Sequence, residues 1–212
     1  MSRGEAGWAG PLTLASIGRD PIEASRRWLS EAYARSRVKY PNAACLSTVD
    51  GQGWPAGRMV LVKEIDPEGY VFYTNYESAK ARALDARPRA ALCFHWHDLE
   101  RQLCVAGQAE RVPAGESDDY FRTRPRDSQL GAWASKQSAE LASREALEAK
   151  CGELGERFRG RDVPRPAHWG GYRVIPEKIE FWQGRPGRLH DRFLFSREAT
   201  VEDGWRVCRL SP

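Results

Sequence analysis

The sequence has no long apolar run and only a small excess of charge of one sign. No stretch of its 212 residues approaches the roughly 20 apolar residues that a membrane-spanning helix needs. Its 33 Lys and Arg residues nearly balance its 29 Asp and Glu residues, and the resulting net charge of +4 does not require a nucleic-acid partner. A hydrophobic share of 41% is also too high for a disordered chain. We therefore expect a globular protein that needs neither a membrane nor a nucleic acid.

Paired cysteine motifs are missing as well. The five cysteines are an odd number and include no C-x-x-C pair, so neither a zinc knuckle nor a disulfide framework fits their spacing. We expect reduced and mostly buried thiols. Residues 1–18 lack the continuous apolar region of a secretory signal, which makes the cytoplasm the expected compartment.

The common signatures of hydrolases and P-loop enzymes do not occur either. The sequence contains no H-E-x-x-H, no G-x-S-x-G and no G-x-x-x-x-G-K-[ST] motif. His95 and His97 would share one face of a strand, but no third ligand stands near them in the sequence. We therefore predict no metal site.

What the sequence does contain is a series of short strand patterns with a few helices. Residues 1–18 are rich in Gly, Ala and Ser without periodicity, which predicts a flexible arm before a single domain over residues 19–212. Helices are predicted at 21–38, with Asp20 as N-cap and Pro21 in the first turn, and at 78–86, 117–124 and 143–158. Strands are predicted at 43–49, 55–65, 70–74, 90–96, 102–111, 172–174, 178–182, 192–196 and 205–210. This order favours an α+β domain built on a barrel of about six to eight mostly antiparallel strands.

Three segments combine basic side chains with hydroxyl or amide groups, as anion sites do. Arg58 and Lys63 bracket an apolar strand; five positions apart, they would point to opposite faces, so a shared ligand requires twist, a bulge or a position at the strand end. Residues 124–128 read Arg-Pro-Arg-Asp-Ser, a rigid basic turn suited to phosphate. Residues 135–138 read Ser-Lys-Gln-Ser and could hold a second anion. Solvated charges or an ordinary capped turn would explain each segment equally simply.

The densest group of functional side chains lies near the C-terminus. Residues 181–184 read Phe-Trp-Gln-Gly, and residues 188–192 read Arg-Leu-His-Asp-Arg. Arg188, His190 and Arg192 alternate by two and would share one face of an extended chain. This pattern is typical of a site for a planar, charged ligand. The alternative interpretation is that these residues are an ordinary cluster of surface charges.

Together and in this order, these segments resemble the bacterial pyridoxamine 5′-phosphate oxidase family. The resemblance runs from about Asp20 to Pro212 and includes further motifs at residues 72–75, 100–102, 131–138, 169–171 and 209–212. It implies an FMN enzyme with a mostly antiparallel split β-barrel and flanking helices. It also implies a homodimer with active sites at the subunit interface, each drawing residues from both chains.

The resemblance assigns roles to individual residues by matching motif. The FMN contacts that it implies are Arg58, Met59, Val60, Leu61, Val62, Lys63, Tyr73, Thr74, Lys80, Gln102, Gln137, Ser138, Trp182 and Arg192. The substrate contacts that it implies are Lys63, Tyr120, Arg124, Ser128, Arg188, Leu189 and His190, the first four of them around the substrate phosphate. Arg188 and His190 are the implied catalytic residues.

The implied reaction oxidises pyridoxamine or pyridoxine 5′-phosphate to pyridoxal 5′-phosphate, with dioxygen as acceptor and hydrogen peroxide as product.

The sequence departs from the family pattern at two places. Ala79 replaces an arginine that many relatives have before the lysine matched to Lys80, which predicts weaker FMN binding. Residues 1–18 also lack an Arg-x-x-Tyr-like segment, which many relatives fold over the substrate. The alternatives are a non-catalytic FMN or pyridoxal-phosphate binding protein, and a related flavin oxidase acting on another planar substrate.

Overall fold

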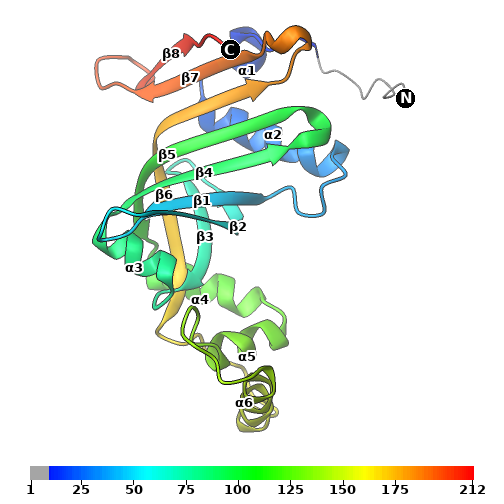
Figure 1. Cartoon of the computed structure of the whole chain (residues 1–212), viewed down its shortest axis with the longest axis vertical. Coiled ribbons are helices and arrows are strands. Elements are labelled where there is room, and N and C mark those ends of the chain that lie inside the picture. The colour runs from blue at the N-terminus through cyan, green and yellow to red at the C-terminus, as the bar shows by residue number, and fades with distance from the viewer. Residues whose placement is uncertain (1–9) are drawn as a thin grey trace.

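The computed structural model describes residues 10–212, which form an antiparallel sheet with helices at both ends (Figure 1). The helices are α1 (Leu14–Ile17), α2 (Pro21–Arg35), α3 (Ala79–Ala86), α4 (Ala114–Thr123), α5 (Arg126–Ala134) and α6 (Arg144–Arg157). The strands are β1 (Ala43–Val49), β2 (Pro55–Ile65), β3 (Tyr70–Asn75), β4 (Arg89–Trp96), β5 (Arg101–Arg111), β6 (Trp169–Gln183), β7 (Asp191–Arg197) and β8 (Trp205–Arg209). Short 3₁₀ turns lie at His97–Leu99 and Pro186–Arg188.

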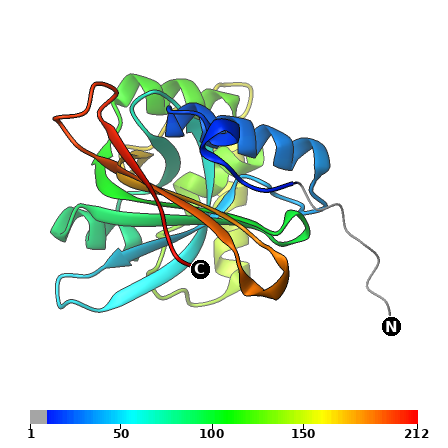
Figure 2. The same cartoon turned by 90° about the horizontal axis from the view of Figure 1, so that it is seen from above.

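Six of the strands close into a barrel. The sheet order is β3-β2-β1-β4-β5-β6-β7-β8, and a direct pairing of β3 with β6 joins the ends of the first six strands. Strands β7 and β8 continue the sheet from the other half of β6 (Figure 2). This arrangement confirms the predicted α+β split barrel.

The barrel core follows from period-2 alternation along the strands. On β4, Leu92, Phe94 and Trp96 are buried inside the barrel, whereas the residues between them face outward. Helix α2 contributes Trp28, whose ring meets Trp96 and Phe181 edge-on at centroid distances of 6.4 and 5.0 Å. The helix thereby covers the inward-facing side chains at this side of the barrel.

The start of α2 agrees closely with the sequence prediction. The Asp20 carboxylate accepts hydrogen bonds from the backbone N–H groups of Ile22 and Glu23, at 2.8 and 3.2 Å. Pro21 occupies the first turn, where its missing N–H is not needed. The helix ends at Arg35, three residues before the predicted end.

Strand β6 corrects one prediction: the two strands expected at 172–174 and 178–182 are one continuous strand. Pro176 can stand inside it because the first half of β6 pairs with β3, the second half pairs with β7, and the proline lies between these pairings. The β5–β6 register also shifts beside Gly107, the partner of Pro176. A Cβ on Gly107 would lie 1.9 Å from the Ile175 carbonyl oxygen, so this close approach requires glycine.

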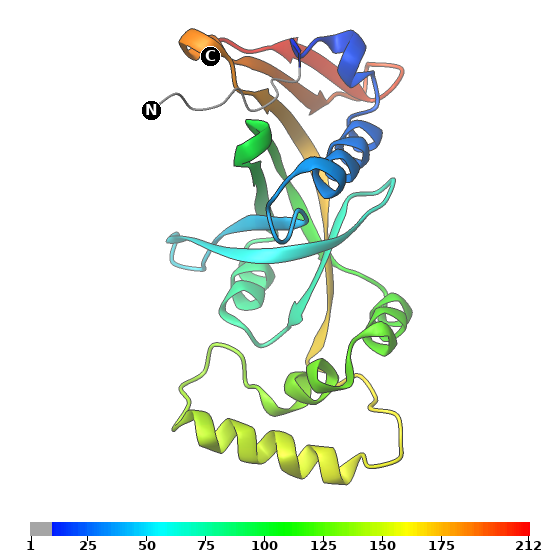
Figure 3. The same ribbon diagram turned by 90° about the vertical axis from the view of Figure 1, so that its right-hand side faces the viewer.

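Helices α4, α5 and α6 form a separate lobe at the end of the barrel opposite α1 and β8 (Figure 3). The lobe has its own small core, which includes Phe121, Leu130, Leu154 and Phe158. The sequence reading missed α5, because it treated residues 124–128 as a turn. Only Arg124 and Pro125 link the two helices, and α5 begins directly after the proline.

The expected arm is partly packed in this structure. Residues 1–9 lie outside the described residues. Within residues 10–18, Ile17 is buried, and the Leu12 backbone N–H donates to Asp191 Oδ2 at 3.1 Å. The Arg27 guanidinium donates to the Ser16 and Ile17 carbonyl oxygens, at 2.9 and 2.8 Å. These contacts attach residues 12–17 to the rest of the described chain. None of the helices described in residues 10–212 is long and apolar enough to cross a membrane.

Candidate active site

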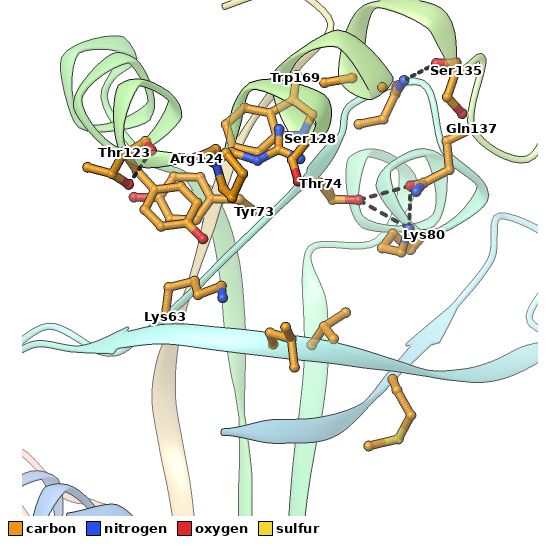
Figure 4. A pocket seen from close by; sticks show the side chains of 18 residues that line it. Lys63, Tyr73, Thr74, Lys80, Thr123, Arg124, Ser128, Ser135, Gln137 and Trp169 are labelled. Atoms are coloured by element: carbon orange, nitrogen blue, oxygen red, sulfur yellow. Dashed lines mark hydrogen bonds between the residues drawn. The ribbon is translucent and has the colours of Figure 1, made fainter. Parts of the chain in front are cut away.

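A cavity of about 630 Å³ lies between the barrel strands β2 and β3 and the helices α4 and α5 (Figure 4). Its lining residues are Met59, Val60, Leu61, Lys63, Tyr73, Thr74, Asn75, Lys80, Tyr120, Thr123, Arg124, Pro125, Ser128, Gly131, Ala132, Ser135, Gln137 and Trp169. Three of these side chains are cationic and none is a carboxylate. The cavity is therefore built to attract an anion.

A β-bulge places Lys63 in this cavity. Val62 pairs with Phe72 and Glu64 pairs with Val71, which leaves Lys63 as the extra residue on β2. Val62 is buried in the barrel core, whereas the Lys63 ammonium lies 6.0 Å from the centroid of the Tyr120 ring. Arg58, five positions before Lys63, does not line the cavity.

One end of the cavity is formed by Lys80 and its partners. The Lys80 ammonium donates to Gln137 Oε1 at 2.7 Å, to Thr74 Oγ1 at 3.1 Å and to Ser78 Oγ at 3.3 Å. All of these acceptors are neutral, and no carboxylate pairs with Lys80 among the residues of the described chain. Burial, and secondarily the charge of Arg58, lower the pKa of Lys80. This ammonium is held in place with its charge uncompensated.

Two further predicted residues adjoin the Lys80 end. The Arg58 guanidinium donates to the Leu46 carbonyl oxygen at 3.1 Å and to Thr48 Oγ1 at 2.8 Å, and burial lowers its pKa. The Ser138 hydroxyl accepts from the Ala79 backbone N–H at 3.1 Å, at the start of α3. Ser138 has a φ of +72°, so the loop turns sharply here.

The other end of the cavity is formed by Arg124. Its guanidinium carbon lies 4.5 Å from the centroid of the Trp169 ring and 5.4 Å from that of Phe121. Its Nη1 atom is buried and has no hydrogen-bond partner in the part of the chain that the structure describes. Burial lowers the pKa of Arg124. A buried guanidinium nitrogen without an acceptor indicates a place for an anionic group that this chain does not supply.

Stacked aromatic rings line the wall between the β3 strand and the helical lobe. The Tyr73 and Tyr120 rings stack at a centroid distance of 4.0 Å, and the Trp169 ring is nearly parallel to both, at 5.5 and 6.2 Å. Burial raises the pKa of Tyr73 to about 12, so its phenol is neutral. Trp169, which also supports Arg124, was not among the predicted site residues, although it opens the Trp-Gly-Gly motif at residues 169–171.

The predicted residues from the C-terminal part of the chain lie elsewhere. Gln102, Trp182, Arg188, Leu189, His190 and Arg192, which we call the C-terminal cluster, do not line the cavity. Strands β5, β6 and β7 bring them together: Trp182 pairs with both Gln102 and Arg192. The structure thus divides the predicted site into two groups at different places in one chain.

The turn before β7 corrects the expected alternation of side chains. Arg188 ends a 3₁₀ turn with a φ of +61°, and strand β7 begins only at Asp191. Arg188 and His190 therefore do not belong to one extended strand with Arg192. The His190 ring instead lies 4.6 Å from the Trp182 ring, and its Nδ1 accepts from the Arg185 backbone N–H at 3.1 Å. A neutral His190 consequently carries its proton on Nε2.

An ion pair and a hydrogen bond hold Arg192 of the C-terminal cluster in place. The Arg192 guanidinium donates to Glu180 Oε1 at 2.8 Å and to the Ser211 carbonyl oxygen at 3.0 Å. The bond to Glu180 raises the pKa of Arg192.

Arg188 and Leu189 are exposed, and 72% of the Leu189 surface is accessible. A large apolar side chain this exposed, beside an exposed guanidinium, is available to contact another molecule.

Comparison with known proteins places this fold and site in one family. Residues 30–157 match the family model described as pyridoxamine 5′-phosphate oxidase. Residues 169–212 match the model of a pyridoxine 5′-phosphate oxidase C-terminal dimerisation region. The second match covers β6, β7 and β8, and therefore most of the C-terminal cluster.

Curated relatives and solved structures agree with these matches. A pyridoxine/pyridoxamine 5′-phosphate oxidase of Rubrobacter xylanophilus is 55% identical over 193 residues, which are 91% of this chain and 87% of the relative. One of Burkholderia multivorans is 51% identical over 201 residues, or 95% and 93% of the two chains. The crystal structure of PhzG from Burkholderia lata, in complex with tetrahydrophenazine-1-carboxylic acid, has a TM-score of 0.88 at 31% identity, covering 97% of this chain and 99% of that one. The chain therefore belongs to the pyridoxamine 5′-phosphate oxidase family, a group of split-barrel flavoprotein oxidoreductases.

Proposed function

We propose that this protein is an FMN-dependent oxidase that converts pyridoxamine and pyridoxine 5′-phosphate into pyridoxal 5′-phosphate, with dioxygen as acceptor and hydrogen peroxide as product. The observation that carries the proposal is the cavity with cations at both ends and no carboxylate in its lining. Such a cavity suits two phosphate groups, one from the cofactor and one from the substrate. The names of the curated relatives support the same reaction.

The residues at the Lys80 end fit the phosphate of FMN. Lys80 supplies an ammonium held by neutral partners, Thr74 supplies a hydroxyl, and Arg58 supplies a second charge. The exposed apolar side chains of Met59 and Leu61 on β2 offer a surface for a flat ring system. When bound there, FMN supplies the two-electron acceptor that no side chain provides.

The residues at the Arg124 end fit the substrate phosphate. The desolvated Arg124 guanidinium, the Lys63 ammonium and the hydroxyl groups of Tyr120 and Ser128 line this end together. A guanidinium forms forked, charge-assisted bonds with phosphate, and the rigid Arg124-Pro125 link fixes its direction. Their role is to hold the phosphate so that the reacting carbon lies at a fixed place in the cavity.

The remaining roles fall to Arg188 and His190, and a homodimer would bring them to the cavity. In one chain these residues do not line it. We propose that the C-terminal cluster of each chain completes the cavity of the other, which the match to a dimerisation region supports. Arg188 then orients the substrate, and His190 moves the proton of the substrate amine or alcohol.

A second candidate is a flavin oxidase for a tricyclic carboxylic acid. The likeness to PhzG favours it, because that structure holds tetrahydrophenazine-1-carboxylic acid. The two candidates differ in the anion that Arg124 would meet, a phosphate in one case and a carboxylate in the other. The combination of two cations and two hydroxyl groups, on Lys63, Arg124, Tyr120 and Ser128, favours phosphate.

An anaerobic titration of the FMN-loaded protein tests the proposal. Pyridoxine 5′-phosphate should bleach the flavin absorbance and yield pyridoxal 5′-phosphate, and admission of air should restore the colour and release hydrogen peroxide. A reduced phenazine carboxylic acid, added to a second sample, is the matched comparison. Bleaching by the phenazine compound alone would support the second candidate, and bound flavin that neither compound bleaches would indicate a non-catalytic binding protein.

A further inference from the structure

The outer face of the barrel carries a row of neighbouring cysteines. Cys45 lies opposite Cys93 across β1 and β4, and Cys93 lies opposite Cys104 across β4 and β5. Directly paired residues point to the same face of a sheet, and here the inner face holds Leu92 and Leu103. The sequence predicted mostly buried thiols, but all of them are free and only partly buried. The difference arises because these strands bury only one face.

Cys93 and Cys104 affect each other's ionisation. The neighbouring Cys104 thiol lowers the pKa of Cys93, and Cys93, together with burial, raises the pKa of Cys104. The Gln102 side-chain amide also donates to Cys104 Sγ at 3.2 Å. A lowered pKa favours the thiolate of Cys93, which is the nucleophilic form of cysteine.

The register permits a bond between the two sulfur atoms. Residues directly opposite each other in an antiparallel pair have Cα atoms about 4.5–5.5 Å apart, and disulfides span about 4.4–6.8 Å. The Cys93–Cys104 pair meets this condition without a change of register. Cys45 is also opposite Cys93, but the residue that lowers the pKa of Cys93 is Cys104.

We propose that Cys93 and Cys104 form a redox-active thiol pair that peroxide converts into a disulfide within one chain. The Cys93 thiolate attacks one peroxide oxygen, the O–O bond breaks, and with one proton the products are a sulfenic acid and water. The Cys104 sulfur then attacks the Cys93 sulfur, the S–O bond breaks, and a second water leaves with the thiol proton. Two thiols are oxidised and one hydrogen peroxide is reduced to two waters.

The proposed oxidase reaction would supply the oxidant next to this face. Gln102, which contacts Cys104, is also one of the expected FMN contacts. The thiol pair does not depend on that reaction, however, because peroxide can be added directly. A failure of the oxidase proposal and a failure of this one are therefore distinguishable.

The test uses the full-length, FMN-loaded protein, fully reduced and then freed of reductant. Limited hydrogen peroxide is added, free thiols are alkylated in denaturant, and the mass and the linked peptides are measured. We expect two of the five thiols to become protected, so that the chain carries three alkyl groups instead of five. Its mass should be two hydrogen atoms below that of a reduced chain with three alkyl groups, and digestion should yield a peptide linking Cys93 to Cys104. Dithiothreitol should reverse all three changes.

Variants assign the pair. Cys93→Ser and Cys104→Ser should each abolish the protection, whereas Cys45→Ser and Cys151→Ser should leave it unchanged. Cys151 lies on α6, away from the barrel, and is the matched control. The peptide map of the unaltered chain gives the answer even if a variant folds poorly. An unchanged thiol count, a link from Cys45 to Cys93, a link between two chains, or sulfinic acid without any link would overturn the proposal.

Discussion

At the residue scale, Arg124 and Lys80 give the cavity two different anion-binding ends. Arg124 has a buried nitrogen without an acceptor among the described residues, and Lys80 has neutral acceptors. We expect Arg124→Ala to weaken the binding of pyridoxine 5′-phosphate by roughly 10- to 100-fold, the range for loss of a charge-assisted hydrogen bond, while FMN affinity changes little. Lys80→Ala should do the reverse. Titration of both variants with both ligands checks this, and equal losses for both ligands would contradict the assignment.

The lowered pKa of Lys80 predicts a pH dependence of flavin binding. Burial and Arg58 disfavour the charged ammonium, so Lys80 loses its proton at a lower pH than an exposed lysine. Its attraction for the FMN phosphate is then fully present below the folded pKa and is lost as the pH rises through it. We expect FMN affinity, measured by quenching of flavin fluorescence, to fall at alkaline pH. Lys80→Met should bind FMN more weakly at neutral pH, and a slope in this variant as steep as in the original protein would assign the effect to another group.

Trp169 supports Arg124, the residue that we propose binds the substrate phosphate. Its ring supports the Arg124 guanidinium and lies parallel to the Tyr120 ring. Trp169→Leu should therefore raise KM for pyridoxine 5′-phosphate several-fold with a smaller effect on FMN affinity, since a cation–π contact with a desolvated cation is worth up to about 2 kcal/mol. Trp169→Phe, which keeps a π face, should restore most of the loss. If both variants change KM equally, Trp169 has only a packing role.

At the scale of the elements, the sequence identified those whose signals are local. The Asp20, Ser78 and Ser143 side chains cap α2, α3 and α6; Asp20 was predicted as a cap, and the two serines open segments that were predicted to be helical. Helix α5 was missed because the Arg124-Pro125 step indicates a turn and carries no signal for a helix directly after it. A bulge near Lys63 was named only as one of three possibilities, because a bulge depends on the partner strand as well.

The continuity of β6 shows a further limit of sequence reading. Pro176 interrupts the strand pattern, and only the partner strands reveal that no ladder hydrogen bond is needed there. Gly107 is part of this arrangement because β5 approaches the β6 backbone at that point. Neither residue has a local signal that distinguishes this role from an ordinary turn.

This close approach predicts the cost of substituting Gly107. In Gly107→Ala the new Cβ would collide with the backbone of Ile175 and Pro176, which cannot rotate away. We expect a loss of about 1–3 kcal/mol or more in the free energy of unfolding, measured by urea denaturation. Gly152→Ala on α6 is the control: its Cβ would meet nothing within 4 Å, and the change should stabilise the helix by roughly 0.5–1 kcal/mol. A Gly107→Ala protein as stable as the original would refute this account of the close approach between β5 and β6.

At the scale of the whole molecule, the sequence predicted one set of site residues but not how one chain divides them. The cavity gathers eight of the expected FMN contacts: Met59, Val60, Leu61, Lys63, Tyr73, Thr74, Lys80 and Gln137. Trp182 on β6, Arg192 on β7 and His190 in the turn before β7 lie together elsewhere in the chain. Spacing along a chain cannot distinguish one site from two halves that meet only in a dimer. The expectation that two chains share each site came from the family resemblance alone.

The most direct test of the central claim is the activity of mixed dimers. Arg124→Ala impairs the cavity, and His190→Ala impairs the C-terminal cluster, with an expected loss of about 100- to 10,000-fold in flavin reduction for the histidine. Both chains are co-expressed with different affinity tags, the dimers that carry both tags are isolated, and oxidation of pyridoxine 5′-phosphate is measured at low substrate concentration. If each active site joins the cavity of one chain to the C-terminal cluster of the other, the mixed dimer has one intact site and should show about half the activity of the unaltered dimer. If each chain holds a complete site of its own, both sites of the mixed dimer are impaired, and activity no higher than the average of the two single variants would contradict the account.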